Sequence, residues 1–210
     1  MTFGPSPRRL APIKVVGMMA SPGELDIALR AVARLPLPPE GGRLEFGPGC
    51  VHVVPGHDDR AARIYTGAAI FVLALALRVQ GCSAHVRLGG SPSRPATIFF
   101  TRPRPPMPRD RRLAAALEAP APAARLTGVT RAELERAAAV EGARLRFTGR
   151  DRAVLSTRGN GPADQLAAGM ALARVLLSAA SRGVPVRFLP AGAEDGCAQA
   201  VLVLGRAARA

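Results

Sequence analysis

Arginine and glycine residues near two predicted turns are the candidates for binding chemistry in this chain. Arg206 follows Gly205 at the end of the last predicted strand. A glycine there lets the backbone approach an anion, and a planar guanidinium can bind a phosphate or carboxylate through two parallel hydrogen bonds. Residues 158–161, which include Arg158 and Asn160, precede a predicted helix, where backbone N–H groups can form an anion nest. The simpler alternatives are a solvated C-terminal arginine and an ordinary loop.

Metal and nucleophilic chemistry have less support in the sequence. Cys50, His52 and His57 lie near one another, but no second pair of ligands has the spacing of a zinc site, so we interpret them as isolated polar residues. Ser156 and Asp151 lie in no nucleophile elbow. The chain contains no P-loop and no dinucleotide-binding fingerprint. The sequence therefore predicts no metal site and gives no support to cofactor-free catalysis.

The net charge of +14 indicates an arginine-biased surface more than a nucleic-acid binder. All but one of the 29 basic residues are arginine, and they are spread along the chain rather than gathered in one block. Aromatic residues make up 4% of the chain, with no tryptophan, which leaves few rings for stacking on bases. Nucleic-acid binding is therefore an unlikely function on sequence grounds, whereas a local anion site remains open.

Length and cysteine usage predict a soluble cytoplasmic protein. The 210 residues suffice for one globular domain or two small ones. The three cysteines are widely spaced and form no Cys-x-x-Cys pair, which favours reduced thiols. The longest apolar run, Gly67–Leu77, is about half of the ~20 residues that span a bilayer, so we expect a buried core helix and no membrane partner.

The elements that position these residues form a repeated pattern. Gly67 lies in a long apolar helix that stops at Gly81 before a strand, and Gly169 and Gly183 hold the same places in a similar helix and strand later in the chain. The two glycines are separated by the same number of residues in both copies. Each copy then ends in a β-type run closed by arginine. A chain of two related halves can place a site on the seam between them.

We expect an N-terminal arm at 1–12, a first half at 13–102, a linker at 103–112 and a second half at 113–210. The predicted helices are Glu24–Leu35, residues 59–80, Asp110–Leu117, Thr130–Glu141 and residues 161–182, and the predicted strands are Arg43–Phe46, Cys50–Val54, Ala84–Leu88, Ala96–Thr101, Ala143–Phe147, Ala153–Ser156, Val184–Leu189 and Ala200–Leu204. Each half thus reads helix, two strands, long helix, two strands, which predicts an α+β fold.

Helix starts and helix packing follow from the same residues. Asp58 or Asp59 is the expected N-cap of the first long helix, and Thr130 is the expected N-cap of the fourth predicted helix, with Glu133 completing a capping box. Both long helices are apolar nearly all round, so we expect them to pack near each other with the sheets outside. Gly67 and Gly169, one in each long helix, then serve close helix packing, with cofactor contact as the alternative.

Several segments, in order along the chain, resemble the nitroreductase superfamily. Asp59-Arg60 precedes Tyr65–Arg78, and Gly81 and His85–Leu88 follow. The later matching segments are Asp110–Leu117, Thr130–Leu145, Ala168–Ala179 and Leu202–Arg206. The chain is most similar to the actinobacterial, Acg-like branch, in which a single chain holds two nitroreductase-like halves.

The resemblance implies a nitroreductase-like fold of two pseudo-symmetric halves with FMN bound between them. In ordinary members of the superfamily that site lies between two subunits, so one chain here supplies both walls, as a monomeric pseudo-dimer or within a homodimer. NAD(P)H and a nitro or quinone acceptor are the implied reaction partners. The expected cofactor-binding residues are Arg206, Gly205, Arg158 and Asn160, and no catalytic residue is assigned.

Two segments depart from the family pattern. An Asn-Thr-Gln-Pro-Trp-type motif usually follows the first helix, where this chain has Leu35–Glu40. An Arg/Thr/Asn-rich run usually precedes the third helix, where this chain has Ala119–Ala124. Both runs normally supply polar contacts to the flavin, and the chain also lacks a lid-like middle segment. The alternative function is therefore a non-catalytic nitroreductase scaffold that sequesters flavin or serves as an interaction partner.

Overall fold

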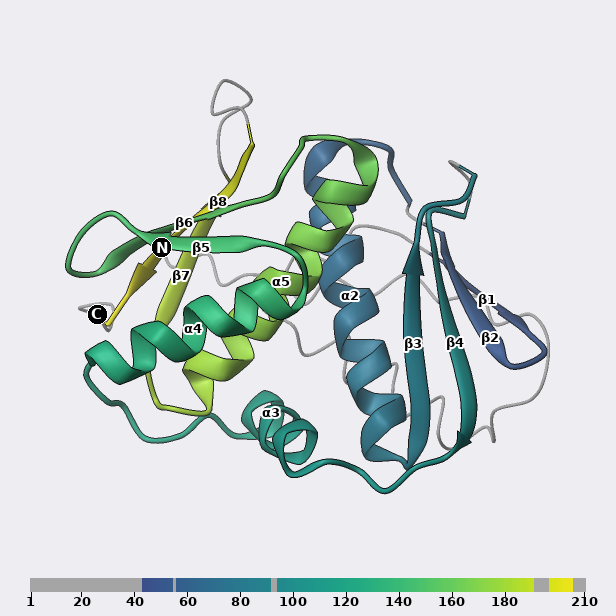
Figure 1. Cartoon of the computed structure of the whole chain (residues 1–210), viewed down its shortest axis with the longest axis horizontal. Coiled ribbons are helices and arrows are strands. Elements are labelled where there is room, and N and C mark those ends of the chain that lie inside the picture. Colours follow the sequence, from purple (N-terminus) through teal and green to yellow (C-terminus); the bar gives the residue numbers. More distant parts are fainter. Residues whose placement is uncertain (1–42, 55, 92–93, 191–196, 206–210) are drawn as a thin grey trace, which may run out of the picture.

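Two sheets and four helices make up the computed structural model, which describes residues 43–54, 56–91, 94–190 and 197–205 (Figure 1). The elements in chain order are β1 Arg43–Gly47, β2 Cys50–Val54, α2 Arg60–Val79, β3 Cys82–Leu88, β4 Ala96–Pro103, α3 Pro108–Glu118, α4 Gly128–Val140, β5 Arg144–Phe147, β6 Arg152–Ser156, α5 Pro162–Ala180, β7 Val186–Pro190 and β8 Ala198–Leu204. The predicted helix Glu24–Leu35 and the predicted site residue Arg206 lie outside the described residues.

Both sheets are antiparallel and four-stranded. The first has the order β1-β2-β4-β3 and the second the order β5-β6-β8-β7, so the strands of each sheet follow the same sequence of positions. Helices α2 and α5 lie side by side in the middle of the molecule, with one sheet outside each of them (Figure 1). Helix α4 packs on α5, and α3 contacts both long helices. The architecture is α+β, as predicted from the sequence.

Helix α2 is the core helix that the apolar run predicted. It starts where the side chain of Asp59 accepts a hydrogen bond from the Ala62 N–H at 2.8 Å, which satisfies one of the free donors at a helix start. Its length and hydropathy alone would suit a membrane span, but 67% of its most apolar window is buried inside the protein. Residues 70–77 are buried on every side of the helix, because α5 and the first sheet cover them.

Glycines allow α2 and α5 to cross at backbone distance. A methyl group at Gly67 would overlap the carbonyl oxygen of Leu166, and one at Gly169 would overlap the carbonyl oxygen of Ile64. The two contacts are reciprocal, because each glycine meets the residue three positions before the other one. Leu166 joins the core of the first sheet, and Ile64 joins that of the second. The prediction that these glycines serve helix packing is confirmed.

The segment 103–112, which we expect to link the halves, runs from the end of β4 at Pro103 into the first turns of α3, which begins at Pro108. One sequence prediction needs correction. Helix α4 begins one turn earlier than expected, with Thr127 rather than Thr130 as its N-cap. The Thr127 hydroxyl accepts from the Thr130 N–H at 3.2 Å, and Thr130 itself is buried in the first turn. Thr127 and Thr130 are both residues that can cap a helix. Thr127 precedes the first turn, so its hydroxyl can reach the free N–H groups at the helix start.

Candidate functional site

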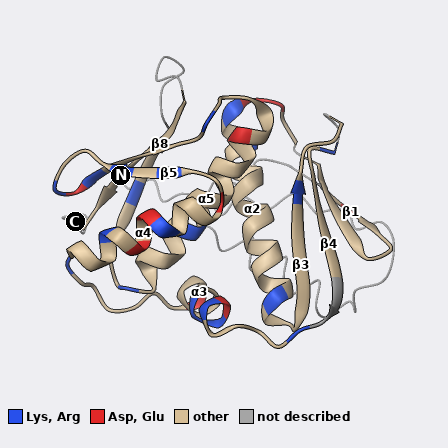
Figure 2. Ribbon diagram, in the orientation of Figure 1, with Lys and Arg blue, Asp and Glu red and all other residues tan. Residues whose placement is uncertain are grey.

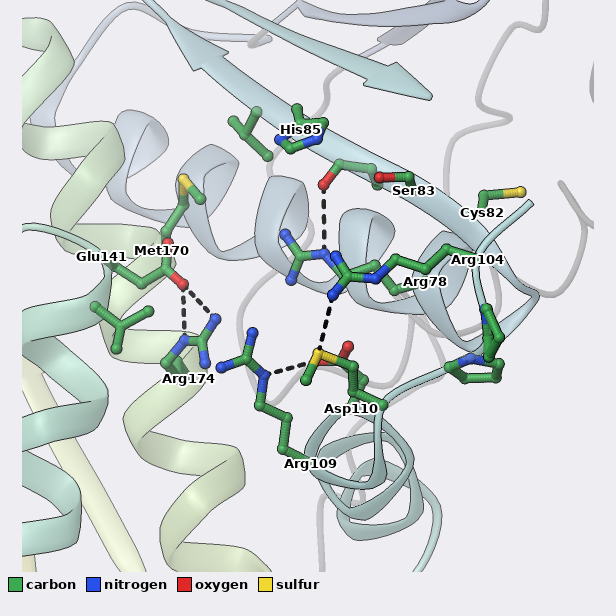
Figure 3. Close-up of a pocket in the computed structure, with 16 residues that line it drawn as sticks. Arg78, Cys82, Ser83, His85, Arg104, Arg109, Asp110, Glu141, Met170 and Arg174 are labelled. Atoms are coloured by element: carbon green, nitrogen blue, oxygen red, sulfur yellow. Dashed lines mark hydrogen bonds and ion pairs between the residues drawn. The ribbon is translucent and has the colours of Figure 1, made fainter. Parts of the chain in front are cut away.

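A cavity of about 320 Å³ opens where the two sheet-and-helix units meet. We call it the seam cavity. The first unit contributes the C-terminal end of α2 and the start of β3, and the second contributes the end of α4 and the middle of α5. The segment before α3 and the first turn of α3 close one side. Its polar lining residues are Arg78, Cys82, Ser83, His85, Arg104, Arg109, Asp110, Glu141 and Arg174 (Figure 3).

Local backbone signals position the arginines of the first unit. Helix α2 stops at Gly81, whose φ of +87° suits glycine and turns the chain directly into β3. Arg78 therefore lies in the last helical turn. The Arg104 N–H donates to the Gly81 carbonyl at 2.6 Å, which holds the segment 104–107 against the end of α2. Pro108 then starts α3, because its fixed φ suits the first helical position.

A buried ion pair forms the wall from the second unit. Arg174 donates through Nε and Nη2 to the Glu141 carboxylate, both at 2.7 Å, and each side chain is only 10% exposed. The Arg174 guanidinium also lies 5.0 Å from the centre of the Phe71 ring on α2. Because both charges are paired, this wall is close to neutral.

The remaining arginines leave the cavity positively charged. Burial lowers the pKa of the Arg78 guanidinium, because desolvation penalises its charge, while Asp110 and Glu141 raise that pKa in part. Arg109 makes a long contact with Asp110, 3.9 Å between Nε and Oδ1, and its side chain is 63% exposed. Figure 3 shows Arg78, Arg104 and Arg109 converging on the same space. Across the rest of the described chain, basic residues are distributed over several elements rather than along one face (Figure 2).

The predicted residue Asn160 lies in an internal polar network. Its side-chain oxygen accepts from the amide nitrogens of Gln165, at 3.2 Å, and Gln199, at 3.3 Å. Gln165 in turn accepts from Arg63 of α2 at 2.9 Å, so the network joins the two units. The Arg158 side chain is exposed, and its carbonyl accepts from Cys197. The Asn160 side-chain oxygen therefore takes part in a hydrogen-bond network that joins the two units at this end of the protein.

The predicted anion nest at the start of α5 already holds a carboxylate. The Gly161 N–H donates to Asp164 Oδ2 at 3.1 Å, and a methyl group at Gly159 would lie 2.7 Å from that same oxygen. An aspartate in the first turn is favourable at the positive end of a helix. A second anion bound at the start of α5 would be repelled by the Asp164 carboxylate.

Of the four predicted cofactor residues, the three that the structure describes do not lie together. Gly205 follows β8, whereas Arg158 and Asn160 lie beside its first residues, so the length of that strand, about 20 Å, separates them. The Gly205 N–H already donates to the Pro185 carbonyl at 2.9 Å. Arg206 lies outside the described residues.

The histidine and cysteine residues of the first sheet form no metal site. His52 Nδ1 contacts Thr97 Oγ1 at 2.9 Å, and Cys50 Sγ lies 3.7 Å from His52 Nε2. Among the described residues no three His, Cys, Asp or Glu side chains are grouped as metal ligands.

Sequence reasoning missed the seam cavity because its residues are far apart in the chain. One signal was present: Arg78 and Arg174 are charged residues in the long apolar stretches of two core helices, and an arginine in such a stretch needs a partner or a polar cavity. The partner of Arg174, Glu141, comes from a different helix, so no spacing along the sequence could identify it.

Comparison with known proteins shows the fold class. No protein-family model matches the chain, and no curated protein matches it. A crystal structure of a Thermotoga maritima protein, provisionally named a nitroreductase, matches with a TM-score of 0.50 and 14% sequence identity over 93% of this chain and 90% of that one. The chain therefore has a nitroreductase-like fold, in agreement with the fold predicted from its sequence.

Proposed function

We propose that this protein is a nitroreductase-like flavoprotein, an FMN-dependent NAD(P)H oxidoreductase of nitro or quinone acceptors. The observation that carries the proposal is the likeness to a nitroreductase-type structure over 93% of the chain. The seam cavity adds support, because a ligand site lined by both units is what a fused pair of halves would provide. FMN, when bound, supplies the hydride chemistry, and the protein supplies position and electrostatics.

We also propose that the chain arose by internal duplication, with its two units standing in for two subunits. Three features support this: the identical strand order of the sheets, the equal glycine spacing in the two halves, and the reciprocal contacts of Gly67 and Gly169 across the α2–α5 crossing. A two-fold interface has this self-complementary pattern, in which each partner presents the same residue to the other. A single chain would then suffice for activity, in keeping with a cytoplasmic, monomeric pseudo-dimer.

Some polar groups of the expected cofactor residues are engaged within the protein. The Asn160 side-chain oxygen and the Gly205 N–H make hydrogen bonds to other residues, and Asp164 places a negative charge at the start of α5, where the anion nest was expected. These observations support the second candidate function, a non-catalytic scaffold of nitroreductase fold that sequesters flavin or binds a protein partner.

An absorbance measurement separates these proposals. The purified protein is incubated with FMN, desalted and scanned between about 350 and 500 nm, where bound flavin absorbs. Retained flavin together with NAD(P)H oxidation above a free-FMN control supports the oxidoreductase. Retained flavin without turnover supports the scaffold. A colourless protein that retains no FMN contradicts the flavoprotein proposal.

A further inference from the structure

The seam cavity carries an unbalanced positive charge. Four arginines and two carboxylates line it, which leaves a net charge of +2. Glu141 is fully engaged with Arg174, and Asp110, which lies 3.9 Å from Arg109, also acts on the Arg78 charge, so the excess is shared by Arg78, Arg104 and Arg109. No carboxylate of the described residues comes within ion-pair distance of Arg78 or Arg104.

Arg78 and Arg104 keep most of their hydrogen-bond donors available. An arginine has five N–H groups. In the described structure Arg78 directs Nε at the Ala84 carbonyl, 3.4 Å away, and Arg104 directs Nη2 at Met107 Sδ, 3.6 Å away. Both contacts are long and leave the remaining guanidinium N–H groups facing the cavity (Figure 3). Arg78 is half-buried, and an anion in the cavity would stabilise its charge by using these donors.

The arrangement suits a phosphate group better than a single carboxylate. Two guanidinium groups from different elements can each bind a pair of oxygens, and a phosphate offers three or more. A phosphate monoester carries a charge of about −1.5 to −2 at neutral pH, which matches the +2 lining. A volume of about 320 Å³ accepts phosphate with a small organic group.

We propose that the seam cavity binds a phosphate dianion, free or as the phosphate group of a small organic phosphate, through Arg78 and Arg104. Ser83 and His85 on β3 offer further polar contacts beside them. The proposal goes beyond the flavoprotein assignment, because it names the residues that bind a phosphate in this cavity and does not require that the phosphate belong to FMN.

Thermal unfolding with inorganic phosphate tests the proposal at constant ionic strength, with sodium chloride replacing phosphate in the reference. We expect a saturable rise in Tm, about 3 °C or more at ten times the Kd. Arg104→Gln and Arg78→Gln should each weaken phosphate binding about tenfold or more, since each removes a charged hydrogen-bond donor. Should Arg78→Gln fail to fold, Arg104→Gln carries the test alone, because Arg104 is exposed.

The matched control is Arg111→Gln. Arg111 is an exposed arginine on α3 that does not line the cavity, so its loss changes the net charge equally and should leave phosphate binding intact. A wild-type Tm that rises no more with phosphate than with sodium chloride overturns the proposal. Equal loss of binding in Arg111→Gln and Arg104→Gln also overturns it, because the attraction is then non-specific.

FMN and riboflavin identify the source of the phosphate. If phosphate binds and FMN displaces it while riboflavin does not, the cavity takes the phosphate of a nucleotide. If phosphate binds and neither competes, the cavity serves another phosphate compound. Both outcomes support the dianion site, and the second arises whether or not the protein binds flavin elsewhere. Failure of the flavoprotein proposal is thus distinguishable from failure of this one.

Discussion

Replacing Gly67 with alanine tests whether the α2–α5 crossing depends on backbone contact. The new methyl group would overlap the Leu166 carbonyl oxygen, which belongs to helix backbone and cannot rotate away. Overfilling a packed core costs about 1–3 kcal/mol, and we take the upper value because two helices must separate. Alanine is a better helix former than glycine by about 1 kcal/mol, which offsets part of that cost. The expected net loss of unfolding free energy is about 2 kcal/mol, or a Tm lower by about 4–8 °C.

Urea unfolding followed by far-UV circular dichroism is the appropriate assay, since the chain has no tryptophan. The midpoint should fall while the m-value stays unchanged. Gly128→Ala is the matched control: Gly128 begins α4, and a methyl group there meets nothing within 4 Å, so this variant should be as stable as wild type or slightly more stable. If Gly67→Ala behaves like Gly128→Ala, the reasoning about backbone contact is refuted.

Two further predictions concern the walls around the seam. Glu141→Ala should lower the unfolding free energy by about 3 kcal/mol, because it leaves the buried Arg174 charge unpaired, and the double variant with Arg174→Met should recover much of the loss in chemical denaturation. Single and double variants that are equally unstable would contradict this explanation. Thr127→Ala should cost about 1 kcal/mol by removing the α4 cap, whereas Thr127→Ser should not. A Thr127→Ala protein with wild-type stability would show that Thr127 does not cap the helix in solution.

Much of the architecture could be predicted from local sequence, since strands, helix starts and helix stops depend on nearby residues. Asp59 as a cap, Gly81 and Gly183 as helix ends, and the buried character of α2 all follow from residue type and spacing. The predicted cap Thr130 was wrong because a second threonine lies three residues earlier, and the choice between them depends on the burial of one side chain.

Candidate site residues were harder to predict, because polar groups can be spent on distant partners. The Asn160 side-chain oxygen accepts hydrogen bonds from Gln165 and Gln199, so this side chain links separate segments of the chain. Gln199, in β8, lies 39 residues from Asn160 in the sequence, so the residues around Asn160 give no indication of this contact.

The sequence by itself determined the two glycine-bounded core helices, the strand pairs that follow them and the α+β class, because periodicity and turn chemistry act over a few residues. The tertiary structure alone decided where charge would gather. Arg78, Arg104, Glu141 and Arg174 come from four separate segments and meet only because α2 and α5 cross at their glycines. The length of β8 separates Gly205 from Asn160. A binding site is a property of distances in space, which the sequence specifies only through the fold.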